Sequence, residues 1–285
     1  MLVSLILATV GRSDDVGRCL RSLAAQTDQN LEVLLVDQNA DDRLVVWVEE
    51  AQALGLNLRH FRMAVPSLSG ARNLGIAESK GQIIGFPDDD CWYEPQVVAQ
   101  LRAAFLAEQN AAGVVANWVE QSAARQVQEA TGTLSYPAWR DFRGGDASSI
   151  SLFFKRSLFD ELRGFDERLG VGQWYGAAEE TDFVLRALAT GAIVQRLPGA
   201  RIHHAYGAPQ KGNLGARCRS VRVRARGTGG IYAKHRLAIS TVLRGLTAPL
   251  LLPLLRFRGW DAMALGVATA LGRLEGLIHW GWGKP

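Results

Sequence analysis

The sequence predicts an α/β protein built on a mainly parallel sheet with helices on both faces. Residues 1–90 alternate short apolar segments with segments whose apolar residues recur at helical spacing, which gives β-α-β-α order. The apolar segments are nearly continuous, as expected of strands that are buried on both faces of a sheet. The 285 residues are enough to bury a sizeable core, in one large domain or in two.

The expected elements follow one another with short connections. A strand at 2–8 precedes a helix that Asp14 or Asp15 can cap and that runs to about residue 26. Further strands are expected at 31–36, 56–61, 83–86, 114–119, 148–155, 193–197 and 200–202, and further helices at 44–53, 69–78, 96–109, 156–162 and 179–190. Residues 120–145 have weak periodicity and are expected to form a loop with short strands.

Three consecutive carboxylates, Asp88, Asp89 and Asp90, follow the apolar segment at 83–86. Like charges this close repel one another, so the cluster is tolerable where something positive sits beside it. Hard oxygen ligands at a strand end suit Mg²⁺ or Mn²⁺. The alternative is a solvated acidic turn, with Pro87 ending the strand.

Polar residues also end two other predicted strands, at Thr9 and at Asp37. In parallel sheets, ligands bind beyond the carboxyl ends of the strands. We therefore expect three polar loops, including the acidic triplet, to converge on one crevice, which favours a functional site over a solvated turn.

Composition and charge give no support for a nucleic-acid-binding protein, a disulfide framework or a cysteine metal site. The formal charge of +4 and the pI near 9.1 suit an anionic ligand or a membrane surface, but the excess is too small to indicate nucleic acid. The three cysteines, Cys19, Cys91 and Cys218, are widely spaced and form neither a metal-ligand pattern nor a disulfide framework, so a reducing cytosol is expected. The short apolar N-terminus lacks a basic flank and is expected to be the first strand.

A second acidic group opens the predicted helix near residue 180. Glu179, Glu180 and Asp182 can simply be first-turn carboxylates favoured by the helix dipole. The functional alternative is that one of them projects into the crevice as a general base. Glu180 and Asp182 are two residues apart, so they point to different sides of the helix. His204 at a strand end is either structural or a ligand for Mn²⁺.

These residues resemble a family 2 glycosyltransferase with the GT-A fold, which is inverting and of the bacterial surface-polysaccharide type. The resemblance covers most of residues 1–235, and its pieces occur in order along the chain. They are SLILAT at 4–9 with Arg12, LRSLAAQ at 20–26, EVLLVD at 32–37, GARNLG at 70–75, FPDDD at 86–90, GFDE at 164–167 and EETDF at 179–183.

The resemblance implies a nucleotide-sugar donor, Mn²⁺ or Mg²⁺ as cofactor, and inversion by direct displacement. Thr9, Arg12, Asp37, Arg72, Asp88 and Asp89 would then be the nucleotide-binding residues. Asp90 would be the direct metal ligand, with His204 as the second ligand and His203 as its substitute if the register is one residue off. Trp174, Glu179 and Asp182 are the candidates for contacts with the donor or acceptor sugar.

The proton acceptor implied by the resemblance is Glu180. The family usually has Asp at this second position of the acidic pair, so the side chain here is one methylene longer while the carboxylate is kept. Two further departures are Gln38-Asn39 after Asp37, and Pro87, which is often Leu in relatives. The acceptor is expected to be a saccharide or a polyprenyl-diphosphate-linked sugar.

The C-terminal part has its own composition, and we divide the chain into a GT-A domain at 1–235 and an apolar helical segment at 236–285. Residues 211–236 are basic and are expected to be a solvated segment or a loop that closes over the diphosphate or meets a phosphate-bearing acceptor. Residues 237–257 and 261–282 are apolar, but Arg244, Pro249 and Pro253 argue against a clean membrane span. A helix pair at 237–282 on the inner face of the cell membrane is favoured. The alternative is a hairpin docked on the catalytic domain or on a second subunit in a homodimer.

Two other functions compete with glycosyl transfer. A nucleotidyltransferase also uses an α/β sheet and Mg²⁺, but such a protein usually has a Gly-rich loop after its first strand, and residues 9–12 contain one glycine. A degenerate module that binds a sugar nucleotide would not need the acidic residues at both Asp90 and Glu180.

Overall fold

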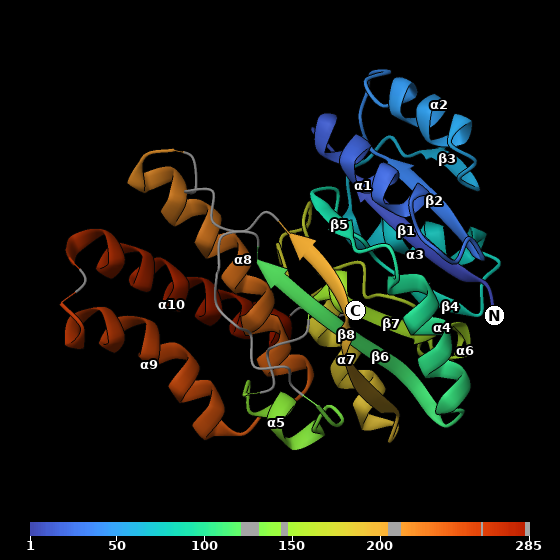
Figure 1. Ribbon diagram of the computed structural model, residues 1–285. Helices are drawn as coiled ribbons and strands as arrows, with labels where there is room; N and C mark the ends of the chain where they lie inside the picture. The colour runs from blue at the N-terminus through green and yellow to red at the C-terminus, as the bar shows by residue number, and fades with distance from the viewer. Residues whose placement is uncertain (121–130, 144–147, 205–211, 258, 283–285) are drawn as a thin grey trace.

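The computed structural model describes residues 1–120, 131–143, 148–204, 212–257 and 259–282 (Figure 1). Within these ranges eight strands form one mixed sheet in the order β3-β2-β1-β4-β7-β6-β8-β5. The strands are β1 Val3–Thr9, β2 Leu31–Asp37, β3 Leu58–Arg62, β4 Ile83–Gly85, β5 Cys91–Tyr93, β6 Ala111–Glu120, β7 Leu152–Lys155 and β8 Ile193–His204. The predicted parallel half is β3-β2-β1-β4, whereas β7 and β5 pair with their neighbours in antiparallel fashion.

Helices cover both faces of this sheet, as the apolar pattern predicts. They are α1 Asp14–Ala24, α2 Val45–Ala53, α3 Leu68–Glu78, α4 Val97–Ala107, α5 Tyr136–Arg140, α6 Arg156–Leu162, α7 Glu179–Ala189, α8 Leu214–Lys234, α9 Ile239–Leu255 and α10 Gly259–Trp282, with a 3₁₀ turn, η1, at Ser149–Ser151. Successive residues of β1 belong to different cores: Leu5 and Leu7 pack with α1, α2 and α4, and Ile6 packs with α3, α6 and α7.

At the end of the sheet, the strands β5 and β8 differ from the prediction. The strand β5 begins directly after the acidic triplet, and Cys91 pairs with His204 in its antiparallel ladder with β8. The two strands expected at 193–197 and 200–202 form a single strand, whose register against β6 shifts between Ala116 and Asn117. As a result the last residue of β8 lies beside the end of the triplet.

Most of the basic segment expected as a solvated stretch or closing loop is the helix α8, Leu214–Lys234, while Lys211 lies outside the described residues. Glycines are contact points between this helix and α10, because a Cβ added at Gly229 would overlap the carbonyl oxygen of Arg273, and one at Gly276 would overlap that of Arg226. In the loop expected at 120–145, the described residues include the short helix α5, while 121–130 and 144–147 lie outside the description.

Helices α8, α9 and α10 lie together at the opposite end of the molecule from α2 and β3 (Figure 1). None of the helices, over the residues described, is both long and apolar enough to cross a bilayer. The division of the chain at 235/236 stays a prediction, although α8, which falls on its first side, packs mainly along α10.

We predict that Gly276→Ala weakens the α8–α10 contact, because the added methyl group would have to displace backbone. Overpacking of this kind costs about 1–3 kcal/mol of unfolding free energy, which a lower urea midpoint would report. Gly281→Ala in the same helix is the control, since an added Cβ there meets nothing within 4 Å. Equal midpoints for the two variants would contradict the close helix crossing.

Candidate functional site

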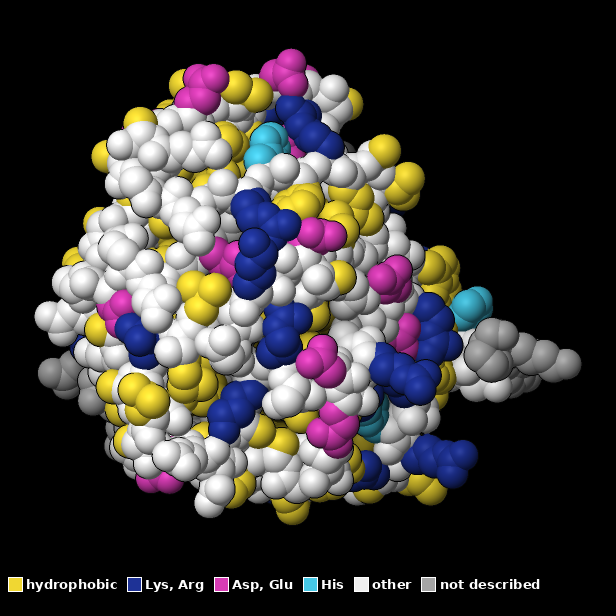
Figure 2. Space-filling view, turned by 90° about the vertical axis from the view of Figure 1, so that its right-hand side faces the viewer, with side chains coloured by type: hydrophobic (Ala, Val, Ile, Leu, Met, Phe, Trp, Pro, Cys, Tyr) yellow, Lys and Arg dark blue, Asp and Glu magenta, His cyan; other side chains and the backbone are white. Residues whose placement is uncertain are grey.

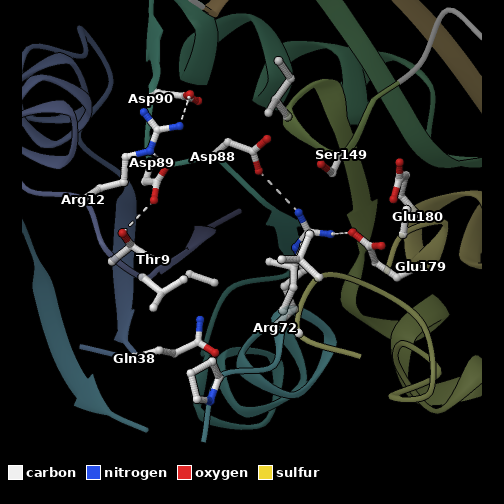
Figure 3. Close-up of a pocket in the computed structure, with 18 of the residues that line it drawn as sticks. Thr9, Arg12, Gln38, Arg72, Asp88, Asp89, Asp90, Ser149, Glu179 and Glu180 are labelled. Atoms are coloured by element: carbon white, nitrogen blue, oxygen red, sulfur yellow. Dashed lines mark hydrogen bonds and ion pairs between the residues drawn. The ribbon is translucent and has the colours of Figure 1, made fainter. Parts of the chain in front are cut away.

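A cavity of about 750 Å³ lies beyond the carboxyl ends of β1 and β4 and reaches the first turn of α7 (Figure 3). The acidic triplet, Thr9 and Arg12 line one end, and Glu179 and Glu180 line the other. Arg72 lies between the two groups. The crevice expected from the strand order is therefore present, and it contains two clusters of carboxylates joined by a cation.

Asp89 and Asp90 are held by groups from β1 and the loop after it. The Thr9 hydroxyl donates a hydrogen bond to Oδ2 of Asp89 over 2.7 Å, and Nη2 of Arg12 lies 2.8 Å from Oδ2 of Asp90. Burial raises the pKa of Asp89 to about 6 despite the Thr9 hydrogen bond. Burial also acts to raise the pKa of Asp90, but hydrogen bonding and charge from His204, together with Arg12, outweigh it and leave that pKa lowered.

Asp88 faces the middle of the cavity. Its side chain keeps 37% of its surface exposed toward the cavity, and the rest is covered by the surrounding protein. Burial therefore raises the pKa of Asp88, against the opposing charge of Arg72. The three neighbouring carboxyls thus differ in environment: Asp88 and Asp89 hold protons more readily than usual, and Asp90 holds its proton less readily.

Arg72 is the buried cation that connects the two clusters. It is 2% exposed, and it belongs to α3, whose first turn is capped by Ser67. Its Nη1 lies 2.9 Å from Oε1 of Glu179 and its Nη2 lies 3.4 Å from Oδ1 of Asp88. The faces of Phe86 and Phe165 lie 5.5 and 5.6 Å from the guanidinium carbon, so cation–π attraction adds to the ion pairs.

Glu180 lines the cavity from the first turn of α7, which begins after Ala178 in the left-handed conformation, φ 79°. Burial and the neighbouring Glu179 carboxylate raise the pKa of Glu180 to about 8. Among the described residues no Lys, Arg or His forms an ion pair with Glu180, whereas Glu179 is paired with Arg72. The two adjacent carboxylates therefore have different chemistry: one is neutralised and fixed, and the other can exchange a proton.

Asp90 and His204 are the side chains whose donor atoms suit a divalent cation. Oδ1 of Asp90 lies 2.8 Å from Nε2 of His204, a contact set by the β5–β8 ladder. Carboxylate and imidazole are ligands for Mn²⁺, and Mg²⁺ commonly takes one or two carboxylates plus substrate phosphates. Over the described part of the chain, no three His, Cys, Asp or Glu side chains are grouped to hold a metal. The pair fits a cation whose remaining ligands come from a bound diphosphate.

Other predicted residues lie outside the cavity. Asp37 is fully buried, and its carboxylate is held by His60 at 3.1 Å and Arg62 at 3.4 Å, while the next residue, Gln38, lines the cavity instead. His203, the alternative to His204, lies 3.0 Å from Glu94. The strand alternation sends it to the other side of β8.

Trp174 and Asp182 do not line the cavity either. Trp174 packs against Tyr175 and His279 with its ring under Arg226. Asp182 is fully buried and lies 2.7–2.8 Å from nitrogen atoms of three side chains, Arg186, Lys234 and His235. Its carboxylate fastens α7 to the end of α8 and does not face a sugar site.

Seven polar residues that line the cavity were not among the predicted site residues: Asp15, Arg18, Gln38, Ser67, Ser148, Ser149 and Arg224. Arg18 sits one turn after Asp14 and Asp15 on α1, and Arg224 belongs to the basic run at 211–236, so helical spacing applied to these runs could have suggested them. Ser149 opens η1, and nothing in its local sequence signals a site.

The sequence matches the family described as glycosyl transferase family 2 over residues 4–162. Among curated relatives, the uncharacterized glycosyltransferase EpsJ of Bacillus subtilis is 32% identical over 114 residues, which is 40% of this chain and 33% of EpsJ. The uncharacterized glycosyltransferase YibD of Escherichia coli is 27% identical over 148 residues, 48% of this chain and 42% of YibD. The aligned part is thus less than half of each relative's length.

Solved structures share the fold. S. aureus TarS 1-349 in complex with UDP-GlcNAc superposes with a TM-score of 0.61 at 14% identity, covering 95% of this chain and 90% of that chain. The mannosyltransferase PcManGT from Pyrobaculum calidifontis, in complex with GDP-Man and Mn²⁺, gives 0.65 at 16% identity, covering 98% and 87%. The predicted GT-A fold is confirmed by these neighbours. Since the family match extends over more than half of the residues, this chain belongs to glycosyl transferase family 2 and is a glycosyltransferase.

Proposed function

We propose that this glycosyltransferase moves a sugar from a nucleoside diphosphate to a hydroxyl of a saccharide or lipid-linked acceptor, with inversion in a single displacement. The observation that carries the proposal is the arrangement of one cavity, with the acidic triplet and Arg12 at one end and Glu180 at the other. The nucleotide sugars in the titles of the two solved structures support a donor of this class. The alternatives, a nucleotidyltransferase or a degenerate module, fit the family and the retained carboxylates less well.

The donor diphosphate would lie at the triplet end. A diphosphate is repelled by three carboxylates unless a divalent cation lies between them, and Asp90 with His204 would hold Mn²⁺ or Mg²⁺ there. The bound ion supplies charge neutralisation for the leaving group. Thr9 and Arg12 position the triplet, and the Arg72 guanidinium adds fixed positive charge near the bond that breaks. Asp37, behind Gln38, would support the nucleoside end indirectly.

The proton of the attacking hydroxyl would go to Glu180. Glu179 is engaged by Arg72 at 2.9 Å, so its carboxylate already has a partner and Glu180 is the one left to accept the proton. The pKa of Glu180, raised to about 8 by burial and by Glu179, gives its ionised form more basicity than an ordinary carboxylate has. Inversion requires the base and the leaving group to be on opposite sides of the sugar, which the two ends of the cavity support.

We predict a pH dependence that Glu180 controls. A base whose pKa is about 8 is protonated below that value, so kcat/KM should rise about tenfold per pH unit below pH 8 and level off above it. Glu180→Gln should lower transfer by about 10²–10⁴-fold and remove this limb, as followed by release of nucleoside diphosphate. Glu161→Gln, at an exposed position of α6, is the control. Wild-type turnover in Glu180→Gln would rule out the assigned base.

We further propose that the C-terminal helices rest on the inner face of the cell membrane. Exposed apolar side chains lie along α9 and α10. The turn between these helices carries Phe257, 95% exposed, beside the exposed Arg256, and the first turn of α10 carries Trp260, 88% exposed. The face opposite α8–α10 is different, because its apolar side chains are scattered among charges of both signs (Figure 2). Aromatic residues beside a basic one suit the interface of an anionic bilayer.

We predict that Phe257→Ser/Trp260→Ser loses binding to vesicles that contain anionic lipid, measured by cosedimentation, while transfer to a water-soluble acceptor persists. Val65→Ser removes another exposed apolar group, 72% exposed, from the loop between β3 and α3 and should bind like the wild type. The membrane assignment fails if the double variant binds as the wild type does. It fails equally if the substitutions abolish a dimer in solution and wild-type protein ignores vesicles.

A further inference from the structure

The arginines along the middle of α8 differ in their partners. Arg217 lies 3.3 Å from Asp261, and Arg222 and Arg226 both pair with Glu275 of α10. Arg224 is exposed and forms no ion pair or hydrogen bond with any of the residues the structure describes, yet it lines the cavity. The positive charges that face α10 are therefore neutralised within the protein, and the one that faces the cavity is left available to a ligand.

Backbone contacts fix Arg224 at the Glu180 end of the cavity. The N–H of Gly176 donates a hydrogen bond to the carbonyl of Val223 over 3.3 Å. At Gly227 a Cβ would overlap the carbonyl oxygen of Ala177, so α8 lies directly against the loop that leads into α7. Val223 and Gly227, which make these contacts, lie on either side of Arg224 in α8. Their partners Gly176 and Ala177 come just before Glu179 in the chain.

The other three arginines of the cavity lining are engaged by carboxylates. Arg12 pairs with Asp15, Asp89 and Asp90, and Arg18 pairs with Asp15 and donates to the backbone of Asp90, so both belong to the triplet end. Arg72 is occupied by Asp88 and Glu179. Arg224 is thus the arginine of the cavity lining that has no carboxylate partner among the described residues. Its place on α8 is against the loop that leads into α7, the helix that carries Glu180.

We propose that Arg224 binds a phosphate group on the acceptor, close to the hydroxyl that is glycosylated. The inference rests on the proposed function, because it takes Glu180 to mark the acceptor side. A guanidinium presents paired N–H donors that match a phosphate, and an anion placed beside Glu180 needs such a counter-charge. A sugar phosphate in solution and a lipid-linked sugar phosphate both carry this group, so the acceptor is defined here by the phosphate alone.

The test compares Arg224→Gln with Arg219→Gln, a control on the same helix that is exposed and outside the cavity. Calorimetric titrations use inorganic phosphate, farnesyl phosphate and farnesol, with the donor end filled by saturating UDP or GDP and Mn²⁺. We expect farnesyl phosphate, inorganic phosphate or both to bind the wild type and Arg219→Gln alike and to bind Arg224→Gln at least about tenfold more weakly. Farnesol should not distinguish the variants.

The titrations also separate the two sources of phosphate. Measurable binding of inorganic phosphate indicates a soluble phosphate acceptor, and binding of farnesyl phosphate alone indicates a lipid-linked one. Equal affinities of Arg224→Gln and wild type, or no binding of either phosphate by the wild type, would overturn the proposal.

Donor hydrolysis without acceptor is measured in parallel. Hydrolysis should fall less in Arg224→Gln than phosphate binding does, and a matching loss there would mean that Arg224 acts on the donor, which also overturns the proposal. A wild-type protein that neither binds nor hydrolyses any nucleotide sugar would instead refute the proposed function, which is a separate result.

Discussion

The guanidinium of Arg72 is buried between two carboxylates, Glu179 at 2.9 Å and Asp88 at 3.4 Å, and the faces of Phe86 and Phe165. Burying these charges is costly, and the arrangement is stable only while each charge keeps its partner, since removing one partner of a buried pair typically costs about 3–5 kcal/mol. The contact ties together α3, the loop after β4 and the first turn of α7. The separation between the acidic triplet and Glu180 therefore depends on this one side chain.

The far end of the sheet supplies the second constraint. Because β5 starts directly after Asp90 and pairs with the end of β8, His204 is brought 2.8 Å from the Asp90 carboxylate. The pairing of β5 with β8 is therefore enough to bring Asp90 close to His204, although the two residues are far apart in the sequence. The carboxylate itself is shared with Arg12, so a ligand that binds there has to redistribute charge that the protein already balances.

The parallel half of the fold was predictable because its signals are local. The apolar run of β1, the helical spacing of the apolar residues of α1 and the strand ending at Asp37 can each be recognised without knowing the neighbours. The strand β5 is three residues long and shows no periodicity, so it forms only because β8 offers an edge. Helix α8 was missed because Gly227, Gly229 and Gly230 suggest a break, whereas close packing against α10 and the loop before α7 requires them.

The site was predictable in residue type more than in orientation. Glu179, Glu180 and Asp182 stand together in the sequence, but Arg72 pairs with the first, and the side chains of Arg186, Lys234 and His235 hold the last. The three carboxylates can be told apart only by the side chains that contact them in the folded protein. Arg224 was hidden in the same way, because a basic run does not reveal which of its members lack an acidic partner.

The central claim is that a nucleoside diphosphate binds at the acidic triplet through a divalent cation held by Asp90. Thermal unfolding of the wild type and of Asp90→Asn with UDP and with GDP, each with and without Mn²⁺, tests it most directly, because a ligand of the folded state raises apparent stability by about 2.7 kcal/mol at a hundred times its Kd. The account predicts that one of the two nucleotides raises the melting temperature of the wild type only with Mn²⁺, and that Asp90→Asn loses this rise. A rise of equal size without Mn²⁺, or one that Asp90→Asn retains, would contradict it.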